Sequence, residues 1–186
     1  MKKHLKRIAV GGIVIGASVA VSLVVFYEYF YIPHFSIVQE GVLYRSGQPG
    51  EGDLQRLRDA YGIRTVVNLR RENEQTGEKG LPFEQERAEV DRLGMHFIHL
   101  PMEGDDPVDT KTVDRWLEIV RDKDNWPILV HCKQGVDRTG LLAAVYRIKV
   151  QGWAPEKALA EAIKERMDPE DEPQLKKYIL ACPAAE

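Results

Sequence analysis

The sequence predicts an α/β domain with a central, mainly parallel sheet and helices on both faces of that sheet. Short runs of β-branched and aliphatic residues alternate with longer amphipathic segments along most of the chain. This alternation is typical of strand–helix–strand units, because parallel strands need a helical crossover between them. The 186 residues, 44% hydrophobic and 30% charged, suffice for one such domain and a short appendage.

The first half of the domain is expected to contain three strands and two helices. Asp53 can cap the first helix, and Gly62 and Gly94 end the two helices. Residues 70–80 are polar and are expected to form a loop. The expected order is a strand at 42–45, a helix at 53–61, a strand at 63–69, a helix at 83–93 and a strand at 95–100.

The second half is expected to be richer in helix. Val113, Trp116 and Val120 have the spacing of a buried helix face, and Pro155 suits the first turn of another helix. The helix at 138–150 is strongly apolar and should lie in the core. The expected order is a loop at 101–109, a helix from residue 110, a strand at 127–130, and helices at 138–150, 155–166 and 172–180.

The N-terminus resembles a single membrane anchor. A basic tail at residues 1–7 precedes an uncharged apolar run at 8–27, which is long enough to span a bilayer. A linker at 28–41 and the α/β domain at 42–186 are expected to follow. The positive-inside rule places the tail in the cytoplasm and the domain on the other side of the membrane. A cleaved signal peptide, with Ser18-Val19-Ala20 as its cleavage site, is the alternative.

Charge and cysteine content narrow the function classes. The net charge of −3 gives no indication of nucleic-acid binding. The five histidines and two cysteines have no metal-ligand spacing, so no metal is expected. Cys182 is interpreted as an incidental residue of the last helix, and a disulfide between it and Cys132 is the alternative.

One stretch carries a pattern suited to phosphate chemistry. Residues 128–130 are β-formers and lead into His131-Cys132, a turn, Arg138-Thr139-Gly140 and a helical pattern. Main-chain N–H groups of such a turn and of a helix N-terminus bind oxyanions, and their field also favours a thiolate at Cys132. Arg138 adds a fork of donors that can hold two phosphate oxygens. The predicted phosphate-binding residues are Lys133, Gln134, Gly135, Val136, Asp137, Arg138 and Thr139.

This stretch resembles the Cys-x5-Arg-[Ser/Thr] signature loop of the cysteine-dependent protein tyrosine and dual-specificity phosphatases. The resemblance includes His131 before the cysteine, Gly135 in mid-loop and Thr139 after the arginine. It implies that Cys132 attacks phosphorus without a metal or cofactor, and that Thr139 donates a hydrogen bond to the sulfur. A structural Cys132 with Arg138 on the surface is the alternative, and it leaves the glycine turn unexplained.

The resemblance also implies a general acid, for which three carboxyls compete. In dual-specificity phosphatases the acid lies on the loop that here spans residues 101–109, so Asp105 is the first candidate and Asp106 the second. A solvated turn in which Asp109 caps the next helix is the alternative. Asp137 matches a loop aspartate of bacterial tyrosine and phosphoinositide phosphatases, although it could instead point outward and pair with a base.

Further segments extend the resemblance to most of the domain. Residues 41–49 and 62–70 resemble these bacterial enzymes and the fungal and plant atypical phosphatases of inositol pyrophosphates. Arg70 is interpreted either as an anion-binding residue or as a surface partner of Glu72 or Glu74. Lys133 favours polyanionic substrates, whereas Val136 replaces a lysine common in phosphoinositide-specific loops.

Three functions are consistent with these residues. The first is a phosphatase of phosphotyrosine and other phosphoprotein substrates, and the second is the same chemistry on phosphoinositides, inositol phosphates or other lipid or small phosphates. The third is a phosphate-binding pseudoenzyme, which the intact Cys132 and Arg138 disfavour. A rhodanese-like sulfurtransferase also uses a cysteine loop but does not require the Arg138-Thr139 pair.

Overall fold

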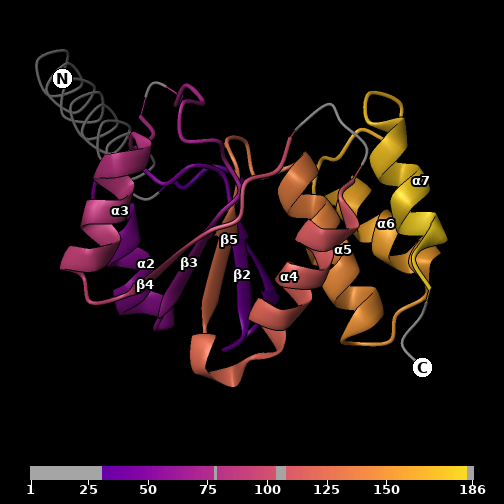
Figure 1. Cartoon of the computed structure of the whole chain (residues 1–186), viewed down its shortest axis with the longest axis horizontal. Coiled ribbons are helices and arrows are strands. Elements are labelled where there is room, and N and C mark those ends of the chain that lie inside the picture. Colours follow the sequence, from indigo (N-terminus) through magenta and orange to yellow (C-terminus); the bar gives the residue numbers. More distant parts are fainter. Residues whose placement is uncertain (1–30, 78, 104–107, 184–186) are drawn as a thin grey trace, which may run out of the picture. The chain divides into compact units, whose positions relative to one another are not determined.

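The computed structural model describes residues 31–77, 79–103 and 108–183. The chain divides into two compact units, Met1–Tyr31 and Ile32–Glu186, and the second is described below. Its centre is a five-stranded sheet in the order β1-β2-β5-β3-β4 (Figure 1). The strands are β1 (Ser36–Gln39), β2 (Leu43–Ser46), β3 (Thr65–Asn68), β4 (His96–His99) and β5 (Ile128–His131).

All neighbouring strands of the sheet run parallel except β1 and β2. This arrangement confirms the predicted α/β class with a mainly parallel sheet. The central strand, β5, pairs with β2 on one side and β3 on the other. The carboxyl ends of these three strands therefore lie next to one another, where ligands bind in sheets of this type.

Strand β1 falls inside the segment predicted to be a linker. Ser36 lies opposite Arg45 and Ile37 opposite Tyr44 in the antiparallel pair with β2. Only Val38 of the four strand residues is fully buried, so the strand has almost no apolar pattern that a sequence could reveal. The second compact unit begins at Ile32, about ten residues before the predicted start of the domain.

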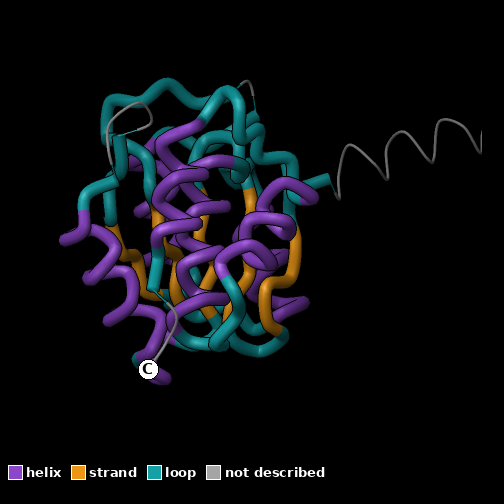
Figure 2. Tube along the Cα trace, turned by 90° about the vertical axis from the view of Figure 1, so that its right-hand side faces the viewer, coloured by secondary structure: helices purple, strands orange, loops and turns teal. Residues whose placement is uncertain are grey.

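Helices cover both faces of the sheet (Figures 1 and 2). One apolar core includes Leu54, Val66 and Val90, and the other includes Val67 and Leu141. Neighbouring strand residues such as Val66 and Val67 point to opposite faces, which is why both cores are filled. The helices are α2 (Asp53–Tyr61) and α3 (Phe83–Arg92) on one face, with α4 (Thr110–Arg121), α5 (Asp137–Lys149), α6 (Pro155–Lys164) and α7 (Pro173–Ala181) on the other.

Helix α5 is buried along nearly its whole length, as its apolar sequence predicted. Its residues from Thr139 to Ile148 are all buried, and it contacts α4, α6 and α7. A helix that is apolar on every side needs such surroundings, because each of its faces must be covered. The first turn of α5 is thereby held rigidly beside the end of β5.

The predicted anchor at 8–27 and its alternative cleavage site lie outside the described residues. Within the described part of the chain, no helix is both long and apolar enough to cross a membrane. The topology inferred from the basic tail therefore stays a prediction.

Candidate active site

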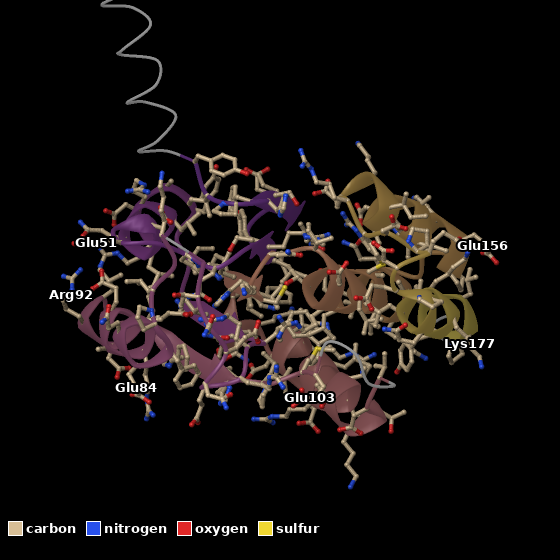
Figure 3. All side chains as sticks on the ribbon, turned by 90° about the horizontal axis from the view of Figure 1, so that it is seen from above. Glu51, Glu84, Arg92, Glu103, Glu156 and Lys177 are labelled. Atoms are coloured by element: carbon tan, nitrogen blue, oxygen red, sulfur yellow. The ribbon has the colours of Figure 1, made fainter. Side chains whose placement is uncertain are left out.

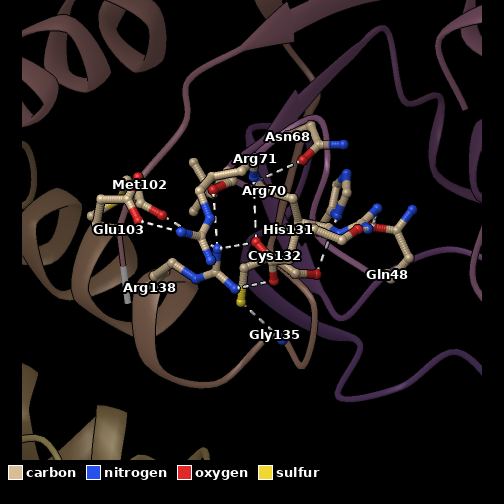
Figure 4. Close-up of polar contacts among 12 residues, drawn as sticks. Gln48, Asn68, Arg70, Arg71, Met102, Glu103, His131, Cys132, Gly135 and Arg138 are labelled. Atoms are coloured by element: carbon tan, nitrogen blue, oxygen red, sulfur yellow. Dashed lines mark hydrogen bonds and ion pairs between the residues drawn. The ribbon is translucent and has the colours of Figure 1, made fainter. Parts of the chain in front are cut away.

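The phosphate-binding loop connects β5 to α5 and begins at Cys132 (Figure 4). Cys132 is buried, and the N–H of Gly135 donates a hydrogen bond to its Sγ at 3.2 Å. Gly135 has a φ of +79°, and a Cβ at this position would lie 2.3 Å from the nitrogen of Gly47. Only glycine fits here, because both the backbone conformation and the close approach to the end of β2 exclude a side chain.

The main-chain oxygens of the loop are held on its outer side. Because a peptide unit is planar and trans, its oxygen and its N–H point in opposite directions. The oxygen of Gln134 faces His34 while the next N–H, that of Gly135, points at the thiol. Four consecutive oxygens are held in this way, that of Lys133 by the N–H of Gln48 (3.0 Å), Gln134 by His34 Nδ1 (2.6 Å), Gly135 by Arg45 Nη2 (2.7 Å) and Val136 by Arg45 Nη2 (3.2 Å).

Arg138 lies in the first turn of α5 with its guanidinium fixed by a carboxylate. Its Nη1 and Nη2 donate to the two oxygens of Glu74 at 2.8 and 2.7 Å, and Nη1 also approaches the main-chain oxygens of Leu69 and Met102 at 3.3 Å. Burial acts to lower the pKa of Arg138, but the hydrogen bonds to Glu74 and the negative charges of Cys132 and Glu74 outweigh it and raise the pKa. The guanidinium is therefore a permanent charge with a fixed orientation.

Glu74 is a site residue that the sequence did not reveal. It lies in the polar segment predicted as a loop, and was considered only as a partner of Arg70. Its side chain and that of Arg138 are 12% and 14% exposed, so the ion pair is largely shielded from water. Nothing local in the sequence distinguishes Glu74 from its exposed neighbours.

Both interpretations of Arg70 are wrong. Its side chain is completely buried, and Nη1 donates to Oε1 of Gln48 at 2.8 Å while Nη2 donates to the main-chain oxygen of Glu74 (Figure 4). It is thus neither a surface ion pair nor an open anion site. Arg70 instead supports the loop that carries Glu74.

A buried carboxylate, Glu86 of α3, connects the ends of three strands. It accepts hydrogen bonds from Gln48 Nε2 at 2.6 Å, Asn68 Nδ2 at 2.9 Å and His131 Nε2 at 2.7 Å. Burial acts to raise the pKa of Glu86, but the charge of His131 and the hydrogen bonds from His131 and Gln48 outweigh it and lower the pKa. The ionised Glu86 therefore fixes His131, and with it the start of the loop.

Of the three acid candidates, Asp137 lies within the described residues. Asp105 and Asp106 lie outside the described residues. Asp137 is half-buried at the start of α5, and burial raises its pKa, as a general acid requires. Asp109 caps α4, since its carboxylate accepts a hydrogen bond from the N–H of Lys111, as the alternative for this loop expected.

The remaining predicted phosphate-binding residues have distinct surroundings. Lys133 and Gln134 are exposed, whereas the side chain of Val136 is buried, so Val136 can offer a phosphate only its main chain. The hydroxyl of Thr139 is buried and has no hydrogen-bond partner in the described part of the chain. The expected hydrogen bond from Thr139 to the sulfur of Cys132 is therefore not formed in this structure.

A cavity of about 230 Å³ adjoins Arg138 and can receive the group that bears the phosphate. Its wall combines apolar and acidic side chains, and it is lined by Pro101, Met102, Glu103, Val108, Asp109, Thr112, Arg138 and Leu175. Seen from above, charged residues such as Glu103, Glu84 and Lys177 lie around the outside of the domain (Figure 3). Glu103, in the cavity wall, also pairs with Arg71 at 2.8 Å, which neutralises the charge of that arginine.

Comparisons with known proteins agree with this geometry. Residues 33–178 match the family model described as "DSP-PTPase phosphatase fused to NAD+ Kinase". The dual specificity protein phosphatase TpbA of Pseudomonas aeruginosa UCBPP-PA14 is 32% identical over 70% of this chain and 54% of its own length. The inositol diphosphatase DSP3 of Arabidopsis thaliana is 33% identical over 69% of this chain and 60% of its length.

A solved structure shows the same fold. The crystal structure of P. aeruginosa TpbA in complex with pTyr superposes with a TM-score of 0.61 at 27% identity, over 76% of this chain and 80% of that one. This chain spans about half the length of the TpbA proteins that it matches. The family match covers both the sheet and the complete phosphate-binding loop. The chain therefore belongs to the DSP-PTPase family of cysteine-dependent phosphatases.

Proposed function

We propose that the domain hydrolyses phosphate monoesters of phosphotyrosine and dual-specificity protein substrates through a phosphocysteine intermediate. The position of Cys132 supports this most directly, because its Sγ accepts a hydrogen bond from the Gly135 amide at the base of the loop. The fixed guanidinium of Arg138 borders the adjoining cavity. The similarity to TpbA, solved with pTyr, favours phosphotyrosine as the substrate group.

The loop residues supply most of the reaction. The Cys132 thiolate attacks phosphorus, so that a P–S bond forms while the P–O bond to the leaving group breaks. The loop amides and Arg138 hold the other phosphoryl oxygens and stabilise their charge. Water then attacks the phosphocysteine, which releases inorganic phosphate and restores the thiolate.

A carboxyl group donates a proton to the leaving oxygen and then accepts one from the attacking water. We propose this role for one of three residues, Asp105, Asp106 or Asp137. For Asp137, burial raises the pKa, which favours the protonated form that donates a proton. The position of Asp105 and Asp106 in the loop before α4 supports them by the resemblance alone.

A second candidate function is hydrolysis of inositol phosphates or other small polyanions. The similarity to the inositol diphosphatase DSP3 supports it, as does the exposed Lys133 in the loop. A polyanion needs accessible cations to bind its additional phosphates, and three nearby arginines do not meet this need. Arg45 and Arg70 are buried and so cannot contact those phosphates, and Arg71 is paired with Glu103. The protein substrate is therefore favoured.

Phosphate release by the full-length chain tests the function. The substrates are phosphotyrosyl and phosphothreonyl peptides, a phosphoinositide and an inositol pyrophosphate, each at equal phosphate concentration. Cys132→Ser should abolish release, whereas Cys182→Ser should leave it unchanged because Cys182 is buried near the C-terminus, away from the loop. Equal release by the intact chain and by Cys132→Ser contradicts the mechanism, and turnover of the inositol pyrophosphate alone favours the second candidate.

We further propose that residues 8–27 anchor the chain in a membrane, with the phosphatase on the extracytoplasmic side. The basic tail and the apolar run support this topology. A reporter fused to the C-terminus tests it, since a reporter active only outside the cytoplasm should give signal. A reporter that is active only in the cytoplasm contradicts it.

A further inference from the structure

Arg45 is a buried arginine directly behind the phosphate-binding loop. It lies on β2, is 2% exposed, and its Nη2 donates to the main-chain oxygens of Gly135 and Val136. Within the described residues it forms no ion pair with a carboxylate, and its Nε has no hydrogen-bond partner. A buried guanidinium held only by neutral oxygens is costly for a fold to keep.

The charges around Arg45 come from the site and from α6. Burial lowers the pKa of Arg45, whereas the charges of Glu165, Cys132, Glu161 and Asp137 act to raise it. Glu161 is already paired with Arg147 at 2.7 Å, which reduces its effect on the pKa of Arg45. Two of the opposing groups, Cys132 and Asp137, thus belong to the phosphate-binding loop and the first turn of the helix that follows it.

A hydrogen bond of Arg45 also determines where a loop amide points. Each peptide plane places an oxygen and the following N–H on opposite sides. The oxygen of Val136 also accepts a hydrogen bond from the N–H of Gly140 in α5 at 2.7 Å, so the helix itself orients the Asp137 amide. The oxygen of Gly135 is turned toward Arg45, and the N–H of Val136 therefore turns away from it. The same relation is visible one residue earlier, where the oxygen of Gln134 faces outward and the Gly135 N–H points at Sγ of Cys132.

We propose that Arg45 is a positioning residue of the phosphate site, which orients the Val136 amide toward a bound phosphoryl group through the oxygen of Gly135. Its positive charge adds to the attraction, because a buried charge acts on a nearby dianion with little screening. The proposal rests on the proposed function, since it requires that the loop binds phosphate. It assigns a role in ligand binding to a side chain that does not contact the ligand.

The test measures binding of inorganic phosphate by calorimetry to the full-length chain carrying Cys132→Ser, so that turnover does not interfere. Adding Arg45→Met should weaken binding at least about tenfold, because the Val136 amide is released and the buried positive charge is lost. Adding Arg45→Lys should weaken it less, since a lysine keeps the charge but not the fork. The control is Arg58→Met, a half-buried arginine of α2 on the other face of the sheet that donates to the main-chain oxygen of Leu93, and it should leave the affinity unchanged.

An amide spectrum separates positioning from general stability. In the Cys132→Ser chain, phosphate should shift the Val136 amide resonance, and this shift should shrink in Arg45→Met and Arg45→Lys. If Arg45→Met does not fold, the Arg45→Lys spectrum decides the question. Unchanged affinity and an unchanged Val136 amide shift in a folded Arg45 variant overturn the proposal, as does an equal loss in Arg58→Met. Failure of the Cys132→Ser chain itself to bind phosphate instead contradicts the proposed function.

Discussion

Two buried charged groups support the same loop in different ways. Glu86, on the α3 side, accepts hydrogen bonds from three side chains, so its carboxylate is satisfied by protein donors. Arg45, on the α5 side, is held by two main-chain oxygens, and its Nε has no partner among the residues that the structure describes. The first group holds the structure together, whereas the second leaves part of its charge available for a ligand. Substitutions of Glu86 should therefore change mainly stability, and substitutions of Arg45 mainly phosphate binding.

The largest effect on stability is expected for Glu86→Leu. It leaves the polar groups of Gln48, Asn68 and His131 buried without their acceptor, so the free energy of unfolding should fall by about 3–5 kcal/mol. Urea denaturation measures this change. The control is Glu89→Gln on the exposed side of the same helix, where a surface ion pair with Arg92 is lost and a much smaller change is expected.

The pH dependence of Glu86 sharpens this prediction. Its pKa is lower in the folded than in the unfolded chain, so its stabilisation is complete above the unfolded value of about 4.5 and is lost as pH falls through the folded pKa. The stability difference between the intact chain and Glu86→Gln should therefore shrink below pH 4.5. A difference that grows on acidification contradicts this assignment.

Gly135→Ala should have the next largest effect, because it disturbs the point where the loop meets β2. The new Cβ would clash with main-chain atoms of Ser46 and Gly47 in a left-handed conformation, which should cost about 2–4 kcal/mol and most of the phosphatase activity. Gly152→Ala is a matched control. Gly152 has a φ of +70°, but a Cβ added there would meet no atom within 4 Å, so only the backbone strain remains, with activity retained.

Glu74→Gln should affect activity more than stability. The loss of one charge in a pair that is largely buried should cost about 1–2 kcal/mol, and the less constrained Arg138 should lower kcat/KM by roughly tenfold. Steady-state kinetics with an aryl phosphate measures the second effect. Glu118→Gln, which removes the exposed partner of Arg115 on α4, should leave kcat/KM nearly unchanged, and an equal loss would show that the effect of Glu74→Gln is not specific to Arg138.

The smallest effect on stability is expected for Asp137→Asn. Burial raises the pKa of Asp137 in the folded chain, so its ionisation destabilises the fold increasingly as pH rises from the unfolded value of 3.8 through the folded pKa. The variant should therefore be slightly more stable at pH 7, by less than about 1 kcal/mol because the group is only half-buried. If Asp137 is the acid, the variant should also lose the basic limb of the pH–rate profile for poor leaving groups.

The sequence predicted what is encoded locally. Alternating apolar patterns gave the order of strands and helices, and the contiguous motif gave Cys132, Arg138 and the loop between them. Arg45, Glu74 and Glu86 were not predicted as site residues, because the tertiary fold brings them to the loop and the helix after it from 45 to 91 positions away. Strand β1 was missed for a different reason, since it buries a single apolar side chain.

The central position of β5 has a consequence for how the domain is made. Strands β2 and β3 are synthesised long before β5, yet in the finished sheet each pairs with β5 and not with the other. During synthesis both therefore expose strand edges until residues near 131 have left the ribosome. The hydrogen bond between His34 and the main-chain oxygen of Gln134 likewise cannot form until Gln134, 100 positions later in the chain, has been synthesised. A nascent chain that stalls before β5 should consequently depend on chaperones that cover exposed strand edges.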